Sequence, residues 1–241
     1  MPADPNSLAV LDGTAAPPGV PVLGATDPAA PATPQVVPLA ITDTREYIAM
    51  QPQDAQPTRG VIFMQGALVD PRAYVRILAP IAEAGYLVTI MKSPYDLPIT
   101  DIGGVGMVIE RHPDVTWWAI GGHSLGGVAA STFAAGNPRL TPGLFLWASY
   151  PANDISDVDE LTVLSVSGAN DGLTTPGDIA ESVPKLPRNS TFQEVPGAAH
   201  WSFGDYGVQA GGGEETVPHE QASAQIAAAT LQWLNTASAV A

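Results

Sequence analysis

Ser124 lies in the stretch AIGGHSLGGVAA, between glycines two residues away on each side, where a serine hydroxyl could act as a nucleophile. Because this hydroxyl is a weak nucleophile at neutral pH, the chemistry needs a histidine to accept its proton and a carboxylate to orient that histidine. The five-residue pattern Gly-His-Ser-Leu-Gly also occurs by chance, and a serine in a tight turn can be purely structural. The elements around Ser124 therefore decide between the two interpretations.

The residues on both sides of Ser124 predict a strand, a sharp turn and a helix. An apolar stretch, 117–120, leads into the glycine-rich turn, and the alanine-rich stretch 128–135 follows it. Gly122 and Gly126 come where the strand and the helix crowd each other, so a Cβ at either position would collide. This context favours a nucleophile held at the carboxyl end of a strand, close to the unpaired amides of a helix N-terminus.

Four histidines compete for the role of general base, and His200 is the best placed. It follows the predicted strand TFQEV within PGAAHWSFGDYG, a glycine-rich loop whose aromatic residues could present it to a pocket. Strand alternation points His123 away from the side of the neighbouring serine, so we expect it to be packed or hydrogen-bonded. His112 and His219 lie in a polar turn and at the start of the last helix, where ordinary surface residues are expected.

Asp171 is the best candidate for the orienting carboxylate. It lies in LSVSGANDGLTTP, directly after an apolar strand, and open α/β sheets build their sites from such loops. The order Ser124, Asp171, His200 is the one expected for an α/β-hydrolase triad. The remaining aspartates near these loops are expected to be solvated or structural: Asp154, Asp157, Asp159 and Asp205.

The oxyanion formed during acyl transfer needs backbone N–H donors that are already in place. One donor should be the amide of Leu125, directly after the nucleophile. The second should come from the loop QGALVDP, where Gly66 allows close approach and Ala67 or Leu68 could donate; we favour Ala67. The alternative is that Gly66 merely lets the chain turn. Gly66 and Leu68 are also expected to line the substrate pocket, with three aromatic residues for which core packing is a nearly equal explanation: Tyr95, Tyr150 and Trp201.

The apolar pattern predicts one α/β domain over residues 36–241, preceded by a Pro- and Ala-rich extended arm over residues 1–35. In the domain, short apolar runs alternate with helix-like stretches, which is typical of parallel strands joined by crossover helices. Helical spacing predicts covering helices within DPRAYVRILAPIAEAG and HEQASAQIAAATLQWL, and Pro80 is expected to kink the first helix or end it early. The predicted strands are 47–50, 60–64, 86–91, 117–121, 144–147, 162–166 and 191–195.

Composition restricts the partners and cofactors. The 241 residues carry a formal net charge of −15 at pH 7, so nucleic acid and anionic membranes would be repelled. The absence of cysteine excludes disulfides, thiolate-bound zinc and a cysteine nucleophile. No His/Asp/Glu cluster has metal-ligand spacing, so we expect no metal and no other cofactor.

The sequence contains no pattern for membrane insertion. No apolar run approaches the roughly 20 residues of a bilayer span, and the N-terminus lacks the order of a signal peptide. We therefore expect a soluble protein. A Pro- and Ala-rich segment such as residues 1–35 often follows a removed export signal, which favours export but leaves the compartment open.

From about Arg45 to its C-terminus, the chain resembles the α/β-hydrolases, and more narrowly the compact bacterial branch of dienelactone-hydrolase-like esterases. Four stretches carry the resemblance in the expected order: QGALVDPRAYVRILAPIAEAGYLV, GGHSLGG, GLFLWASYPA and FGDYGVQ. The resemblance implies a mostly parallel sheet flanked by helices, and a serine carboxylic ester hydrolase with Ser124, Asp171 and His200 as its triad. The short segment ASYPANDISDVDE between the predicted strand 144–147 and the next one leaves no room for a lid domain. We expect an open site that takes soluble or extended small-molecule esters.

Two alternatives stay open. An open site would also admit polymer chains or cyclic esters, so a polyesterase or a lactonase is the alternative on the same fold. A non-catalytic binding protein is the alternative of another class, because a fold does not fix a function. The complete ordered triad argues against that second alternative.

Overall fold

The structure is a computed structural model that describes residues 1–5, 8, 11 and 37–240. In this part of the chain, eight strands form one sheet in the order β1-β2-β4-β3-β5-β6-β7-β8. β1 and β4 both pair antiparallel with β2, whereas the pairs from β4 to β8 are parallel. The strands are β1 (Leu39–Asp43), β2 (Tyr47–Pro52), β3 (Arg59–Met64), β4 (Leu87–Met91), β5 (Trp117–His123), β6 (Gly143–Trp147), β7 (Thr162–Gly168) and β8 (Thr191–Val195).

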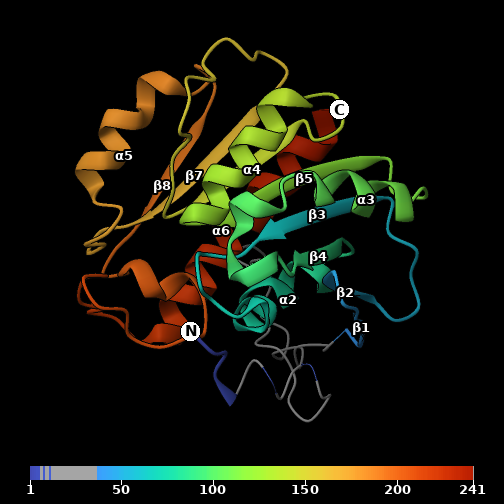
Figure 1. Ribbon diagram of the computed structural model, residues 1–241, viewed down its shortest axis with the longest axis horizontal. Coiled ribbons are helices and arrows are strands. Elements are labelled where there is room, and N and C mark those ends of the chain that lie inside the picture. The colour runs from blue at the N-terminus through green and yellow to red at the C-terminus, as the bar shows by residue number, and fades with distance from the viewer. Residues whose placement is uncertain (6–7, 9–10, 12–36, 241) are drawn as a thin grey trace, which may run out of the picture.

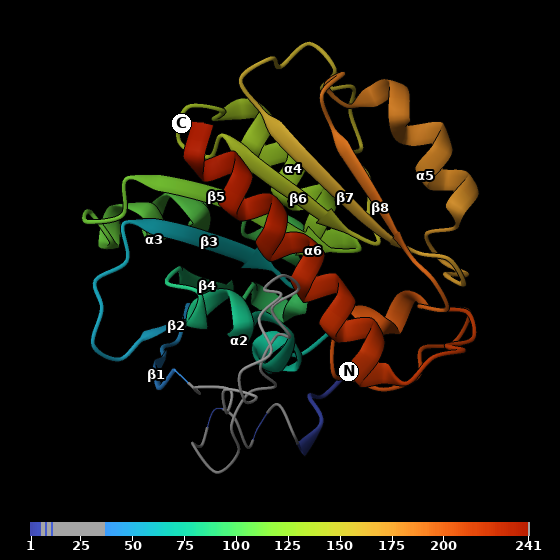
Figure 2. The same ribbon diagram turned by 180° about the vertical axis from the view of Figure 1, so that it is seen from behind.

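Helices cover both faces of the sheet. Figure 1 shows α3 (Gly104–Arg111), α4 (Leu125–Gly136) and α5 (Pro176–Ser182) on the near face. Figure 2, from behind, shows α6 (His219–Val240) crossing the other face, which α2 (Val75–Glu83) also covers. Within the described residues, no helix is both long enough and apolar enough to cross a membrane. Short 3-10 helices complete the loops: η1 (Pro71–Tyr74), η2 (Pro94–Asp96), η3 (Pro98–Thr100), η4 (Val183–Lys185) and η5 (His200–Phe203).

The central strand β3 shows how the sheet separates two apolar layers. Successive side chains of a strand point to opposite faces. Val61 and Phe63 pack in the layer beneath α2 and α6, while Ile62 and Met64 pack in the layer beneath α3 and α4. Because both faces are covered, the strand is apolar from Gly60 to Met64 rather than alternating.

All seven predicted strands are present, with ends shifted by two residues at most. The sequence reading missed β1, an edge strand whose residues are half-buried or exposed and which therefore lacks the apolar run of a central strand. Pro80 does not end α2, because the helix continues to Glu83 with the proline ring buried. The predicted arm, residues 1–35, lies outside the described residues except for residues 1–5, 8 and 11.

Candidate active site

Strained backbone gathers where the parallel strands end. Among the described residues, the non-glycine residues with positive φ all follow one of four neighbouring strands, β3 to β6: Leu68, Tyr95, Asp96, Ser124 and Ala148. A non-glycine residue in this region costs about 1–3 kcal/mol, and such strain concentrates at functional sites. This edge of the sheet is therefore the candidate site.

Ser124 occupies the turn between β5 and α4, with φ 52° and ψ −121°. Its N–H donates to the Trp147 carbonyl oxygen at 3.0 Å. Its own carbonyl oxygen accepts a hydrogen bond from Ser149 Oγ at 2.7 Å. Both contacts tie the turn to the end of β6, so the strained backbone of the serine is held from two sides.

The glycines around Ser124 are required by space. A Cβ added to Gly122 would lie 2.4 Å from the carbonyl carbon of Gly126, and a Cβ added to Gly126 would lie 2.1 Å from the Met64 carbonyl oxygen. Real Cβ atoms do not approach backbone this closely. The predicted crowding of strand and helix at these two glycines is confirmed.

Asp171 and His200 are joined by a buried hydrogen bond in which His200 Nδ1 donates to Asp171 Oδ2 at 2.8 Å. The two residues are 3% and 1% exposed. The other carboxylate oxygen accepts from the N–H groups of Leu173 and Thr174, each at 2.8 Å. Since an ionised carboxylate only accepts, this pairing places the ring proton on Nδ1 and leaves Nε2 of His200 free to accept a proton.

His123, the residue before Ser124, contacts His200 directly. The rings of His123 and His200 have centroids 4.7 Å apart, and His123 Nε2 donates to the His200 carbonyl oxygen at 3.1 Å. In the described residues, no hydrogen bond joins Ser124 Oγ to His200. Catalytic hydrogen bonds are often long before substrate binds and tighten in the complex.

A buried series of hydrogen bonds runs through His123, and the donor and acceptor of each bond can be assigned. At one end the Gly66 N–H donates to Tyr74 Oη at 2.8 Å, and Tyr74 Oη contacts His123 Nδ1 at 2.9 Å. At the other end the His200 carbonyl can only accept, so His123 Nε2 carries the proton. Nδ1 must then accept, and the Tyr74 hydroxyl donates to it. The predicted packed and hydrogen-bonded His123 is confirmed.

The side chains of Tyr74 and His123 in this series of hydrogen bonds are both neutral. Burial lowers the pKa of His123 well below its usual value, and the charge of His200 lowers it further. Burial also raises the pKa of Tyr74 above its usual value, despite the hydrogen bond from Gly66. A proton is therefore neither gained nor lost here near neutral pH.

Contacts of the loop after β3 separate the two candidates for the second oxyanion donor. The Leu68 N–H donates to the Asp96 carbonyl oxygen at 2.8 Å and is occupied. The Ala67 N–H has no partner among the described residues. Leu125 opens α4, so its N–H has no acceptor inside the helix. Of these three candidate donors, Ala67 and Leu125 have N–H groups without an acceptor in the described part of the chain.

The structure brings some of the predicted pocket residues together and leaves others apart. Leu68 and Tyr95 lie on loops joined through Asp96, with 59% and 86% of their surface exposed. Tyr150 is half-buried after β6, and no contact in the described residues connects it with the triad. Trp201 is half-buried and stacks on His219, with ring centroids 5.7 Å apart and planes 12° apart.

Sequence reasoning missed a charged cluster beside His200. His219, expected on the surface, has a side chain only 25% exposed and contacts Asp205 and Glu215. Asp205 is buried, as the structural role expected for it requires. The four-residue spacing of Glu215 and His219 was the available signal, but residues 215–218 precede the helix, so the spacing alone did not indicate contact.

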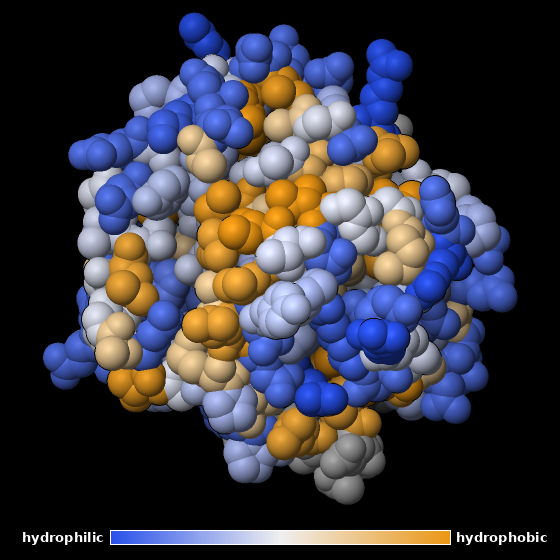
Figure 3. Space-filling model, viewed as in Figure 1, coloured by the Kyte–Doolittle hydropathy of each residue, from blue (hydrophilic) through white to orange (hydrophobic). Residues whose placement is uncertain are grey.

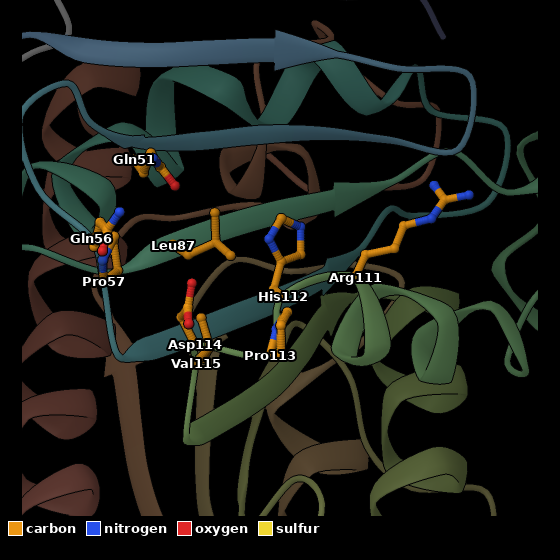
Figure 4. A pocket seen from close by; sticks show the side chains of 9 residues that line it. All are labelled: Gln51, Gln56, Pro57, Leu87, Arg111, His112, Pro113, Asp114 and Val115. Carbon is orange, nitrogen blue, oxygen red and sulfur yellow. The ribbon is translucent and has the colours of Figure 1, made fainter.

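One cavity lies far from these residues. Figure 4 shows a cavity of about 170 Å³ next to the amino-terminal ends of β4 and β5, at the opposite edge of the sheet from Ser124. It contains none of the predicted site residues. His112 lines it, half-buried and in contact with Tyr47 Oη at 3.2 Å, and burial together with the charge of Arg111 lowers the pKa of that histidine.

Residues 60–224 match the family model described as alpha/beta hydrolase family. The chain belongs to the alpha/beta hydrolase family. The predicted fold, a mostly parallel sheet flanked by helices, is confirmed. No helix is inserted in the described segment between β6 and β7, as expected for a hydrolase without a substantial lid domain. No curated protein matches the sequence.

Several solved structures of hydrolases share the fold. Est1E from Butyrivibrio proteoclasticus has 15% identity and a TM-score of 0.58, with 82% of this chain and 99% of that chain covered. A ferulic acid esterase from Streptomyces cinnamoneus has 15% identity and a TM-score of 0.61, covering 77% of this chain and 68% of that one. A monoacylglycerol lipase from Paleococcus ferrophilus has 15% identity and a TM-score of 0.60, covering 76% and 96%.

Proposed function

We propose that this hydrolase is a serine carboxylic ester hydrolase that acts through an acyl-enzyme on small-molecule esters. The proposal rests on the buried hydrogen bond between Asp171 Oδ2 and His200 Nδ1. This bond lies at the same edge of the sheet as Ser124, whose backbone φ is positive. An oriented histidine with a free Nε2 is the base that a serine nucleophile needs. The ferulic acid esterase and the monoacylglycerol lipase among the similar structures support an ester as substrate.

The mechanism is a two-step acyl transfer. His200 Nε2 accepts the proton of Ser124 Oγ as Oγ attacks the ester carbonyl carbon, and the N–H groups of Leu125 and Ala67 donate to the oxyanion. The intermediate collapses as the alcohol leaves with the proton from Nε2. Water then attacks the acyl carbon and loses a proton to His200 Nε2. As the bond from this carbon to Ser124 Oγ breaks, His200 returns the proton to Oγ and the carboxylic acid is released. Asp171 orients the ring and stabilises the imidazolium in both steps.

Exposed apolar side chains around the site support an accessible ester with apolar groups. Leu68 and Tyr95 follow β3 and β4, and Leu173, which is 46% exposed, lies two residues after Asp171. Figure 3 shows further apolar residues gathered in the centre of the face that carries α4. Because the exposed Tyr95 could also contact an extended chain, a polyesterase is the second candidate, and a lactonase is a third activity for the same residues.

The test is hydrolysis of dissolved p-nitrophenyl esters from acetyl to long acyl chains, with Ser124→Ala and the control Ser190→Ala. Ser190 lies in the loop before β8, away from the candidate site. A fluorophosphonate probe followed by peptide mapping locates the nucleophile. We expect turnover of short chains by the wild type and the control, none by Ser124→Ala, and the label on Ser124.

Two results would contradict the proposal. A folded wild type without turnover or label on any of the esters would favour a non-catalytic binding protein. Faster hydrolysis of emulsified long-chain triglycerides than of dissolved short esters would contradict the open, accessible site. Polyester films and lactones, assayed by acid release, separate the alternatives on the same fold.

A further inference from the structure

A chain of alternating charges lies beside the segment that carries His200. Arg76 Nε donates to Asp205 Oδ2 at 3.1 Å, and His219 Nε2 donates to Asp205 Oδ1 at 3.0 Å. His219 Nδ1 donates in turn to Glu215 Oε1 at 3.2 Å. The carboxylates of Asp205 and Glu215 are only 1% and 5% exposed. Three different segments, α2, the residues after η5 and the start of α6, therefore meet at buried charges.

The contacts of His219 require its protonated form. Both ring nitrogens face carboxylate oxygens, which accept and do not donate when ionised. Two N–H donors exist together on the ring only in the imidazolium. A neutral His219 would leave either Asp205 or Glu215 facing a ring nitrogen with no proton.

The Glu215 end of the cluster reaches the residues next to His200. Ser202 Oγ donates to Glu215 Oε1 at 2.5 Å, the same oxygen that His219 contacts. Ser202 Oγ also accepts from the Ala199 N–H at 2.9 Å. Hydrogen bonds thus connect His219 to both sides of His200 along the chain, and Trp201 stacks on the His219 ring.

We propose that His219 is a positioning residue that works only as the imidazolium, clamping Asp205 and Glu215 so that the segment 199–202 holds His200 in place. The proposal rests on the proposed function for its effect on turnover. Loss of the proton from His219 releases one carboxylate, and η5 then loses its tie to α6, so that His200 is fixed less closely although His123 still holds its carbonyl oxygen. The geometry of a general base has to be held closely, because a displacement of about 1 Å can cost about 100-fold in rate.

The charged groups around His219 favour its protonated form. Burial lowers the pKa of His219, but the hydrogen bond to Asp205 and the negative charge of Glu215 outweigh it, so the pKa lies above the usual value. Arg76 neutralises Asp205 from α2 and also donates to the exposed Glu220 at 3.4 Å. A raised pKa means that the stabilisation is complete below the ordinary histidine pKa and is lost as pH rises through the folded-state value.

The experiment compares wild type, His219→Gln and His219→Arg, with His112→Gln as the matched control at the opposite edge of the sheet. NMR titration of the imidazole Cε1–H measures the protonation of His219 directly. The pH profiles of kcat and KM for a dissolved p-nitrophenyl ester report on His200, and circular dichroism verifies folding at each pH. The pH dependence of urea unfolding supplies a readout that needs no activity.

We expect His219 to titrate above the ordinary histidine range, and wild-type kcat to fall about tenfold or more as it does so, with KM little changed and the fold retained. His219→Gln should have the low kcat at all pH values. His219→Arg, which keeps two N–H donors and its charge, should retain kcat beyond the wild-type fall. His112→Gln should match the wild type.

Three outcomes would overturn the proposal: a titration of His219 at or below the ordinary range, a His219→Gln profile equal to that of the control, or a loss in His219→Arg at the same pH as in wild type. If no ester is turned over, the proposed function fails separately. The His219 titration and the difference in unfolding between wild type and His219→Gln then still decide whether the clamp exists.

Discussion

Tyr74→Phe tests the buried hydrogen-bond chain quantitatively. The ring of Tyr74 is fully buried and would keep its packing, so the variant removes only the hydroxyl. Two buried groups then lose their partner: the Gly66 N–H, which donates to this oxygen, and His123 Nδ1, which accepts from it. An unsatisfied buried polar group costs about 1–3 kcal/mol, so the free energy of unfolding should fall by about 2–6 kcal/mol.

The same variant should lower kcat more than it changes KM. Gly66 precedes the Ala67 amide proposed for the oxyanion, and His123 donates to the His200 carbonyl, so both sides of the site lose a fixed contact. The assays are urea unfolding, with its slope unchanged, and hydrolysis of p-nitrophenyl acetate. A loss of about tenfold in kcat is expected from small displacements at both ends.

Tyr86→Phe is the matched control, because its hydroxyl is also buried in a fully buried side chain. That hydroxyl contacts Asn235 Oδ1 at 3.1 Å and Ser238 Oγ at 3.2 Å, and both partners lie on α6 with access to water. Its loss should cost no more than about 1 kcal/mol and leave kcat unchanged. If Tyr74→Phe proved no less stable than Tyr86→Phe, the stabilising role assigned to these buried hydrogen bonds would be refuted.

Four further substitutions have expected outcomes. Gly126→Ala puts a Cβ 2.1 Å from the Met64 carbonyl oxygen and should destabilise the fold and abolish turnover, whereas Gly136→Ala in the same helix meets nothing within 4 Å and should raise stability by up to about 1 kcal/mol in thermal melts. Burial raises the pKa of Glu83 to about 7 from 4.5; wild-type stability should therefore fall as pH rises from about 4.5 to 7, and Glu83→Gln should be more stable above pH 7 but not below 4.5 in urea unfolding. Asp171→Asn should turn its amide toward His200 and move the ring proton to Nε2, so that kcat falls about 10³–10⁴-fold in a folded protein.

The features that the sequence predicts well are local ones. Apolar runs mark β3 to β7 because each of these strands is buried on both faces, and the glycines flanking Ser124 mark the turn because a side chain there meets backbone. The strand ends then place Asp171 and His200 at one edge, since parallel strands bring their carboxyl ends together. The placement of both residues at that edge could be predicted without knowledge of any long-range contact.

The features that the sequence does not predict depend on partners distant along the chain. Ala67 and Leu68 are equivalent neighbours until the Leu68 N–H is seen to donate to Asp96 on the loop after β4. From the sequence, His219 is only the first residue of a helix. The role proposed for it depends on Asp205 and on Arg76, which precedes Ser124 in the sequence. No periodicity or turn rule encodes such pairs.

Two hydrogen-bond networks of different chemistry contact the segment that carries His200. They should therefore respond differently to a change in pH. The network through Tyr74 and His123 is buried and neutral, so it holds the His200 carbonyl oxygen without titrating near pH 7. The network through His219 is ionic and reaches Ser202, so it changes when one proton is lost. A rise in pH should therefore loosen η5 from the side of α6 while the loop after β3 keeps its position. In amide exchange at rising pH, after correction for the intrinsic rate, protection should fall first near residue 202 and remain at residue 66.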